Sequence, residues 1–203
     1  MNQEELKQSA GILALIRVRN QVIDGLPDEY RPADEAEAYQ VQEQLHELLD
    51  EAGYGKRVGY KIGCTTSVMQ KFLGIDNPCA GGIYNTATNY IAVTAQLDNF
   101  SHPGVECEIA AFIGSDMVPA SDGSPFTRES VTPSVQALFG AIEIVDDRWT
   151  DYKKVDTPTL IADDFFASGI VLSQPKPANE APDLATARGR MTINGTEVGE
   201  GTT

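Results

Sequence analysis

Residues 104–114 read GVECEIAAFIG, and the rest of the chain is interpreted around this stretch. Apolar residues bounded by a glycine at each end predict a strand. Side chains alternate between the two faces of a strand, so Glu106 and Glu108 point the same way, roughly 7 Å apart. The opposite face is apolar and is expected to belong to the core. It is formed by Val105, Cys107 and Ile109.

Two neighbouring carboxylates on a mostly buried strand repel each other and lose solvation, so a compensating charge is expected beside them. The residues alone leave two interpretations open. In the first, the carboxylates bind a divalent cation, and a site made only of carboxylates favours Mg²⁺, Mn²⁺ or Ca²⁺ over zinc. In the second, this face of the strand simply meets water.

A second acidic strand lies at residues 141–149, which read AIEIVDDRW. Glu143 stands between two isoleucines, and this position fits a third metal ligand better than a solvent-facing residue. Three carboxylates that leave positions open for water and substrate commonly hold Mg²⁺ or Mn²⁺. We expect Asp146, Asp147 and Arg148 to form a structural ion-pair cluster at the end of this strand.

The composition describes a globular protein of one domain, with or without a helical N-terminal appendage. Its 203 residues are 41% hydrophobic and 22% charged. The formal net charge of −15 argues against nucleic acid and anionic membranes as partners. No apolar run approaches the roughly 18 residues of a membrane span, and the acidic N-terminus does not resemble a signal peptide. Cys64, Cys79 and Cys107 indicate reduced thiols in a cytoplasmic protein.

Hydrophobic periodicity predicts helices first and strands afterwards. Helices are expected over residues 3–22 and from Asp34 to Gly53, with Asp34 and Glu37 as a capping pair and His46 on the helix surface. We therefore divide the chain into a helical region, residues 1–56, and a β body, residues 57–203. The body is expected to contain a strand over 57–65, a helix over 67–73, a loop over 74–82, strands over 90–95, 105–113, 137–145 and 170–172, and a hairpin over 190–198 that turns at Asn194-Gly195.

The strand over residues 57–65 carries Lys61 and Gly63 on one face. A lysine beside glycines, which allow close approach of a ligand, is a candidate contact for an anion. The alternative is a solvated lysine at the edge of a sheet.

Together these segments resemble the fumarylacetoacetate hydrolase superfamily, on the branch of the 2-keto-4-pentenoate hydratases. The resemblance rests on five motifs that occur in the family's order. They are GYKIGCT at 59–65, GIDNP at 74–78, VECEIA at 105–110, AIEIVD at 141–146 and IADD at 161–164.

The resemblance implies an α+β fold, in which a helical N-terminal region accompanies a mixed, twisted β-sheet rolled around the active site. It implies Mg²⁺ or Mn²⁺ bound by three glutamates, Lys61 as a catalytic residue beside the substrate carboxylate, and substrate binding by Lys61, Gly63 and Asp76. The three implied metal ligands are Glu106, Glu108 and Glu143. Members of the family mostly form oligomers, so a homo-oligomer is expected.

The implied activity is a metal-dependent hydro-lyase that adds water to a 2-hydroxy-2,4-dienoate or 2-oxo-4-enoate, as in the catabolism of aromatic compounds. A 2-oxo acid can chelate a divalent ion, which then stabilises an enolate. Because the same enolate serves other reactions, a decarboxylase of the 4-oxalocrotonate type and an acylpyruvate-type C–C hydrolase are alternatives. A truncated, non-catalytic homologue that serves as a binding or structural subunit is the alternative of another class.

The chain departs from the family pattern at two places. Hydratases usually carry an acid after the loop proline, where this chain has Pro78-Cys79-Ala80-Gly81. A proton-transfer group is therefore missing, and Cys79 is expected to be filler in place of a substitute acid. The family pattern also continues past Thr203 into further strands, so we expect either a chain truncated at its C-terminus or a degenerate member of the family, and a sheet with an open edge.

Overall fold

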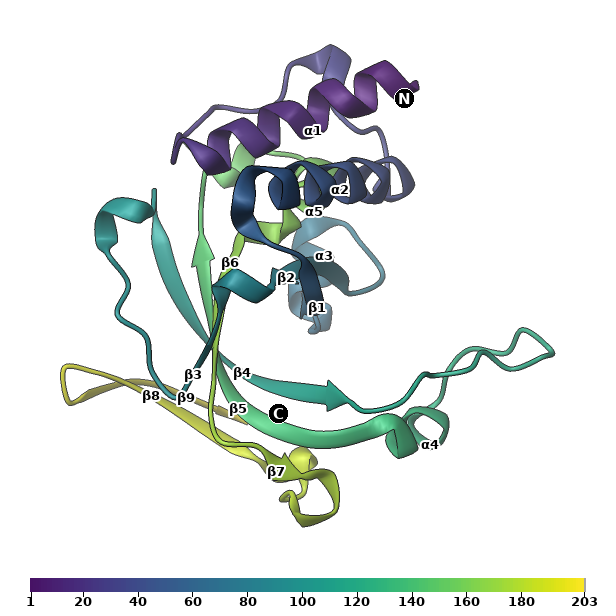
Figure 1. The fold of residues 1–203 in the computed structure, drawn as a ribbon, viewed down its shortest axis with the longest axis vertical. Helices are drawn as coiled ribbons and strands as arrows, with labels where there is room; N and C mark the ends of the chain where they lie inside the picture. The colour runs from purple at the N-terminus through teal and green to yellow at the C-terminus, as the bar shows by residue number, and fades with distance from the viewer. Residues whose placement is uncertain (203) are drawn as a thin grey trace. The chain divides into compact units, whose positions relative to one another are not determined.

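The computed structural model describes residues 1–202. Its first two α-helices precede all of its strands in the chain (Figure 1). The helices are α1 (Gln3–Val18), α2 (Glu35–Leu49), α3 (Ser67–Leu73), α4 (Arg128–Val131) and α5 (Thr157–Ala162). The strands are β1 (Arg57–Gly63), β2 (Cys79–Tyr84), β3 (Thr88–Tyr90), β4 (Pro103–Ile113), β5 (Val135–Asp146), β6 (Ala167–Leu172), β7 (Lys176–Pro177), β8 (Arg188–Ile193) and β9 (Thr196–Thr202). Within these residues no helix combines the length and apolar character needed to cross a membrane.

The chain forms two compact units, and strands β4 and β5 contribute residues to both. Unit 1 comprises residues 1–89, 94–105 and 144–170; unit 2 comprises residues 90–93, 106–143 and those from 171 onward. Among the described residues, β1 pairs with β2, β8 pairs with β9, and a five-stranded sheet has the order β3-β6-β5-β4 with β7 beside β5. The predicted division at residue 56 stays a prediction.

The helices of unit 1 begin where capping side chains predict. The Asp34 carboxylate accepts a hydrogen bond from Glu37 N at 2.9 Å, which starts α2 as expected. α1 ends at Val18, four residues before the predicted end, because Asn20 adopts a positive φ of 49° that no helix contains. Ile23 then forms an isolated parallel β-bridge with Trp149, in which the N–H of Ile23 donates a hydrogen bond to Arg148 O at 3.1 Å.

The hydrophobic core described for unit 1 lies mainly between α1, α2 and α5, and Figure 1 shows α1 and α2 side by side. Both helices present one apolar stripe at helical spacing, which is buried. Leu13, Leu45, Leu160 and Trp149 are at most 2% exposed. This core provides a rigid support for the two strands that follow.

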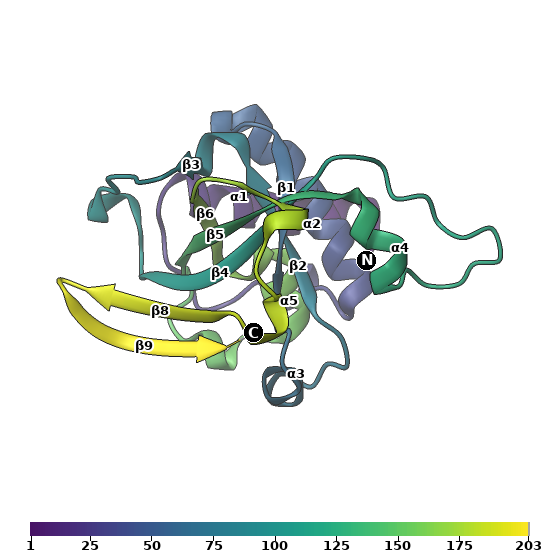
Figure 2. The same cartoon turned by 90° about the horizontal axis from the view of Figure 1, so that it is seen from below.

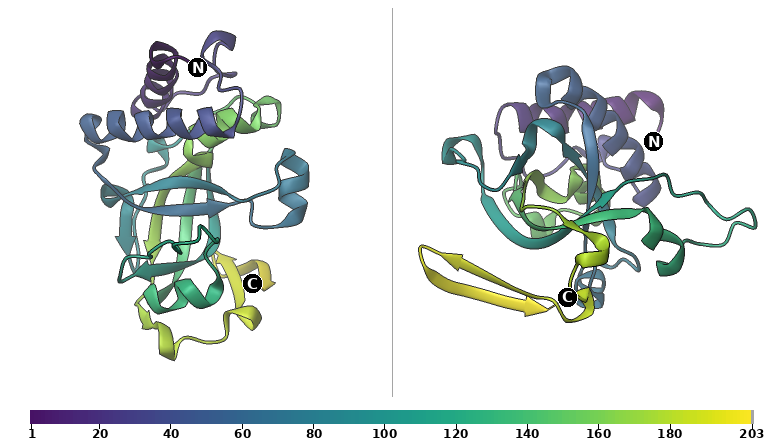
Figure 3. Two further views of the ribbon diagram at one scale, coloured as in Figure 1. Left: turned by 90° about the vertical axis from the view of Figure 1, so that its right-hand side faces the viewer. Right: turned by 60° about the horizontal axis from the view of Figure 1, so that its bottom comes forward.

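The ribbon of β1 and β2 is antiparallel, and Lys61 of β1 stands opposite Gly81 of β2. The predicted loop over 74–82 is therefore wrong for its last four residues, which belong to β2. Gly81 and Gly82 mimic a loop in the sequence, but here they allow close packing: a Cβ at Gly81 would lie 2.6 Å from Asp164 O. Figure 3 shows α3 beyond the end of this ribbon.

Unit 2 contains most of β4 and β5 together with the hairpin of β8 and β9, which Figure 2 shows as a two-stranded ribbon. The predicted turn is confirmed, since Asn194 and Gly195 have φ values of 51° and 80°, the conformation that Asn-Gly hairpin turns favour. The predicted strand over 90–95 is wrong. β3 ends at Tyr90, because Ile91 adopts a φ of 69° that breaks the extended backbone.

The apolar face of β4 is not core, contrary to expectation. Val105 and Ile109 are 49% and 38% exposed, and Cys107 is exposed as well. In unit 2 the hairpin lies close to this face at Gly189, where an added Cβ would be 3.1 Å from Cys107 Sγ. A cavity of about 780 Å³ remains beside Cys107 and Ile109, so the face is incompletely covered.

Candidate functional site

Three glutamates of unit 2 converge as the alternation of side chains predicts. Glu106 and Glu108 extend from the same face of β4, and Glu143 extends from the neighbouring β5. One carboxylate oxygen from each residue lies within 4.8 Å of the others. Glu143 is 7% exposed, whereas Glu106 and Glu108 are exposed, so the cluster has a buried base and an open side.

The donor set of this cluster suits a hard divalent cation. All three ligand atoms are carboxylate oxygens, which Mg²⁺, Mn²⁺ and Ca²⁺ prefer, while no imidazole or thiolate belongs to the cluster. Like charges at such separations repel each other, and a cation at their centre removes that repulsion. With three protein ligands, an octahedral ion would keep coordination positions for water and substrate.

Lys61 belongs to unit 1 and is half-buried. Its Nζ donates a hydrogen bond to Phe165 O at 2.8 Å and lies 5.9 Å from the centroid of the Phe165 ring. Its ammonium therefore has a backbone partner in addition to any solvent, while β1 remains an edge strand of the two-stranded β1–β2 sheet. Its ammonium is held by the backbone of a segment that lies 104 residues later in the sequence.

The other two predicted substrate contacts also lie in unit 1. Gly63 pairs with Cys79 across the β1–β2 ribbon, and a Cβ on Gly63 would lie 3.7 Å from Lys61 Nζ, an ordinary contact. Asp76 is exposed in the turn that follows α3. The roles of Lys61, Gly63 and Asp76 toward a substrate stay predictions.

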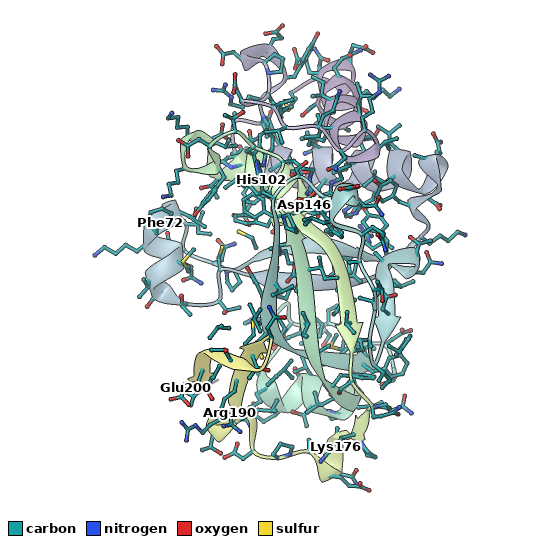
Figure 4. The ribbon with its side chains drawn as sticks, turned by 90° about the vertical axis from the view of Figure 1, so that its left-hand side faces the viewer. Phe72, His102, Asp146, Lys176, Arg190 and Glu200 are labelled. Atoms are coloured by element: carbon teal, nitrogen blue, oxygen red, sulfur yellow. The ribbon has the colours of Figure 1, made fainter. Side chains whose placement is uncertain are left out.

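A buried cluster of charges in unit 1 was not predicted in full. Arg148 lies 3.7 Å from Asp146, which confirms the expected ion pair at the end of β5, but it also binds Asp163 at 3.1 Å. Asp146 Oδ1 accepts hydrogen bonds from the backbone N–H groups of Ser101 and His102, at 2.8 Å each (Figure 4). Asp146 thus joins β5 to the segment that leads into β4.

Asp147 differs from its two neighbours in this predicted cluster. Its carboxylate accepts a hydrogen bond from Trp149 N at 3.0 Å, and burial raises its pKa above the ordinary aspartate value. Asp147 is therefore bound mainly to the backbone, and the expected three-residue ion-pair cluster is centred instead on Arg148.

Asp163 and Asp164 are completely buried, and two arginines and a histidine surround them. Arg17 Nε lies 3.0 Å from Asp163 Oδ1, and Arg17 Nη1 lies 3.2 Å from Asp164 Oδ2. His46 Nε2 is 2.7 Å from Asp164 Oδ1. The prediction that His46 lies on the helix surface is wrong, because this contact draws the imidazole inward to 7% exposure.

The electrostatics of this cluster keep its charges paired. Burial raises the pKa of Asp164, but Arg17, His46 and the N–H of Gly82 together lower it below the ordinary aspartate value. Burial lowers the pKa of Arg17, and Asp163 and Asp164 raise it by more. For Arg148, burial prevails and the pKa is lowered. The sequence signal was the acidic pair that directly follows the apolar residues of α5.

Cys79 occupies the position where an acid was expected. It is 1% exposed, and burial, followed by the neighbouring Cys64, raises the pKa of its thiol to about 12. A thiol with that pKa exchanges its proton poorly near neutral pH. This supports the interpretation of Cys79 as filler.

Comparison with known proteins shows several enzymes of similar sequence, while no family model matches the chain. The chain is 28% identical to 2-hydroxyhexa-2,4-dienoate hydratase of Comamonas testosteroni over 179 residues, which are 87% of this chain and 65% of that enzyme. It is 37% identical to 2-keto-4-pentenoate hydratase of Paraburkholderia xenovorans over 106 residues, 51% of this chain and 38% of that enzyme. It is 24% identical to 4-oxalocrotonate decarboxylase of Pseudomonas putida over 207 residues, 99% of this chain and 75% of that enzyme. The chain thus spans less than two thirds of the two hydratases.

A solved structure shares the fold. The 4-oxalocrotonate decarboxylase of Pseudomonas putida G7, complexed with magnesium and adipate, superimposes with a TM-score of 0.86 at 19% identity, and the match covers 100% of this chain and 74% of that one. The same enzyme complexed with calcium and acetate gives a TM-score of 0.85. The predicted α+β fold class is confirmed. The sequence matches and the shared fold together confirm the resemblance of this chain to the fumarylacetoacetate hydrolase superfamily, on its 2-keto-4-pentenoate hydratase branch.

Proposed function

We propose that the chain is a divalent-metal-dependent hydro-lyase that adds water to a 2-hydroxy-2,4-dienoate or 2-oxo-4-enoate. The observation that carries this proposal is the convergence of Glu106, Glu108 and Glu143 within 4.8 Å. The similar enzymes named as hydratases support the substrate class. A cytoplasmic location belongs to the same proposal, because all three cysteines of the chain are free thiols.

In this proposal the three glutamates bind Mg²⁺ or Mn²⁺. When bound, the ion would supply electrophilic stabilisation to the oxygens of a 2-oxo acid as negative charge develops on them. The solved decarboxylase structures that contain magnesium or calcium support a divalent ion of this kind. The glutamates themselves fix the ion, and the exposed side of the cluster admits the substrate.

Lys61 is proposed to bind the substrate carboxylate, with Gly63 and Asp76 as further substrate contacts. An ammonium carries three donors, so it can be held by a backbone carbonyl and also contact a carboxylate. A fixed positive charge would attract the anionic substrate, which the chain's net charge of −15 otherwise repels. Lys61 thereby orients the substrate and does not need to transfer a proton.

A decarboxylase of the 4-oxalocrotonate type is the second candidate. It is favoured by the match to that enzyme along 99% of this chain, and by Cys79 at the position where hydratases usually carry an acid. Both reactions pass through the same enolate, so the glutamate cluster suits either one. The acylpyruvate-type hydrolase and the non-catalytic homologue have no observation of their own in their favour.

We also propose a homo-oligomer, which the outward face of the β1–β2 ribbon supports. Val58, Tyr60 and Ile62 are 60%, 56% and 55% exposed and form one face of β1. On α3, which follows β1 in the chain, Phe72 is 63% exposed (Figure 4). Exposed apolar side chains on one strand face favour an interaction surface, and a second copy of the chain is the proposed occupant.

The glutamate cluster predicts the outcome of a metal-binding experiment. The change Glu143→Gln keeps the shape of the side chain but removes one of three anionic ligands, so Mn²⁺ affinity should fall at least about tenfold, or about 1.4 kcal/mol. Isothermal titration calorimetry of the folded variants measures this. The matched control is Glu129→Gln, an exposed acid of α4 that should leave the affinity unchanged. Equal Mn²⁺ affinity in the Glu143→Gln variant and the wild type would contradict the proposed site.

Activity assays distinguish the candidate functions. With Mg²⁺ or Mn²⁺ present, the wild-type chain should consume 2-hydroxypenta-2,4-dienoate, measured by the loss of dienol absorbance, and EDTA should stop the reaction. Lys61→Met should lower kcat/KM at least about 100-fold through loss of the oriented charge, while Lys71→Met on α3 should not.

Release of CO₂ from 4-oxalocrotonate without dienoate hydration would assign the decarboxylase instead. No metal-dependent turnover of either substrate would leave the acylpyruvate-type hydrolase and the non-catalytic homologue.

Sedimentation of the wild-type chain tests the proposed homo-oligomer. The mass should be a multiple of 21.9 kDa, and Ile62→Glu should shift it toward the monomer because a charge is placed on the apolar face. Val118→Glu, at a residue that is 81% exposed in a loop, serves as the control and should leave the mass unchanged. A wild-type monomer at micromolar concentration would refute this proposal.

A further inference from the structure

A turn of unusual backbone conformation follows α5. Asp164, Phe165 and Phe166 have φ values of 55°, 46° and 66°, and none of them is glycine. Side chains with a Cβ rarely adopt this region, and three such residues in a row require strong support from the surrounding structure. Strained segments of this kind are enriched at functional sites.

The support comes from the buried charges at the start of the turn. The Asp164 carboxylate accepts a hydrogen bond from Gly82 N at 2.9 Å and lies 2.7 Å from His46 Nε2 and 3.2 Å from Arg17 Nη1. Arg17 Nη2 also donates to the backbone carbonyl of Asp163 at 2.6 Å. Side chain and backbone are therefore held together at the residue where the left-handed conformation begins.

The turn packs directly against the strand ribbon that carries Lys61. Gly81 stands opposite Lys61 in the register, and a Cβ on Gly81 would lie 2.6 Å from Asp164 O and 3.2 Å from Asp164 Cα. Only a residue without a side chain allows this approach. The position of the turn relative to Lys61 is thus fixed from both sides, by the ion pairs and by the ribbon.

The middle residue of the turn makes the contact with the lysine. Phe165 O accepts the hydrogen bond from Lys61 Nζ at 2.8 Å. The direction of that carbonyl is set by the left-handed conformation of Asp164 and Phe165, because rotation about their backbone bonds would turn the carbonyl away. The ammonium is therefore aimed by a backbone group, and the buried carboxylate of Asp164 fixes that group.

We infer that Asp164 is a positioning residue for Lys61, which it orients through the left-handed turn and the carbonyl of Phe165. The inference deepens the proposed function, since the role of Lys61 toward a substrate rests on that proposal. Every contact in it lies within unit 1. The arrangement gives the completely buried Asp164 a role beyond its ion pair with Arg17.

The test uses Asp164→Asn in the full chain, a change that keeps the side-chain shape and removes the charge. The first measurement is acylation of lysines by acetic anhydride, followed by mass spectrometry. The ratio of the Lys61 rate to the rate of exposed Lys71 should rise at least about threefold, because Lys61 is no longer held by the carbonyl.

The second measurement is a double-mutant cycle on kcat. Asp164→Asn should lower kcat at least about tenfold in the wild type and have little further effect in a Lys61→Met background.

Two further variants separate positioning from a general loss of stability. Leu13→Ala removes buried side-chain volume from the helical core and should lower the melting temperature without changing the Lys61 to Lys71 ratio. His46→Gln weakens the support of Asp164 and should raise the ratio in the same direction, which decides the question if Asp164→Asn does not fold. An unchanged ratio in a folded Asp164→Asn or His46→Gln variant would overturn the inference. Failure of the proposed function looks different: turnover is then absent from the wild type, while the acylation ratio still responds to Asp164.

Discussion

The buried ion pairs of Arg17 with Asp163 and Asp164 are the interaction on which unit 1 depends. They join α1 to the end of α5, and through the N–H of Gly82 they reach β2 as well. Removal of one partner from a buried pair leaves an uncompensated charge and costs about 3–5 kcal/mol. Because the α1 residue lies 146 positions before its partner Asp163, the pair closes a very long loop of chain. Without it, the left-handed turn at Asp164 would keep only the contacts of Asp164 with His46 and with the β1–β2 ribbon.

The two acidic clusters of the chain solve the same electrostatic problem in different ways. In unit 1 the carboxylates are completely buried and are neutralised by arginines that are themselves buried. In unit 2 the cluster of Glu106, Glu108 and Glu143 consists of carboxylates with an open side. The first arrangement is a structural support, whereas the second suits an exchangeable cation. Sequence alone distinguishes the two poorly, since both consist of acids beside apolar residues.

Local patterns in the sequence predicted what depends on neighbours along the chain. The alternation around Glu106, the cap at Asp34 and the turn at Asn194-Gly195 follow from a few residues each, and the structure confirms them. Features that depend on distant partners were missed. The burial of His46 depends on its contact with Asp164. Strand β2 was missed because Gly81 and Gly82 resemble a loop in the sequence, whereas in the structure they allow close packing. The apolar face of β4 was expected in the core, yet it is incompletely covered, because strand alternation does not say what lies above a face.

A thermal melt with EDTA, with Mg²⁺ or Mn²⁺, and with metal plus oxalate tests the central claim, that three strand glutamates form a metal site able to bind a 2-oxo acid. Oxalate mimics the enolate of such an acid. Ligands that bind only the folded state stabilise it, so metal at roughly 100 times its Kd should raise the melting temperature by about 5–10 °C, and oxalate should raise it further. A cooperative melt that responds to neither metal nor oxalate would contradict the account.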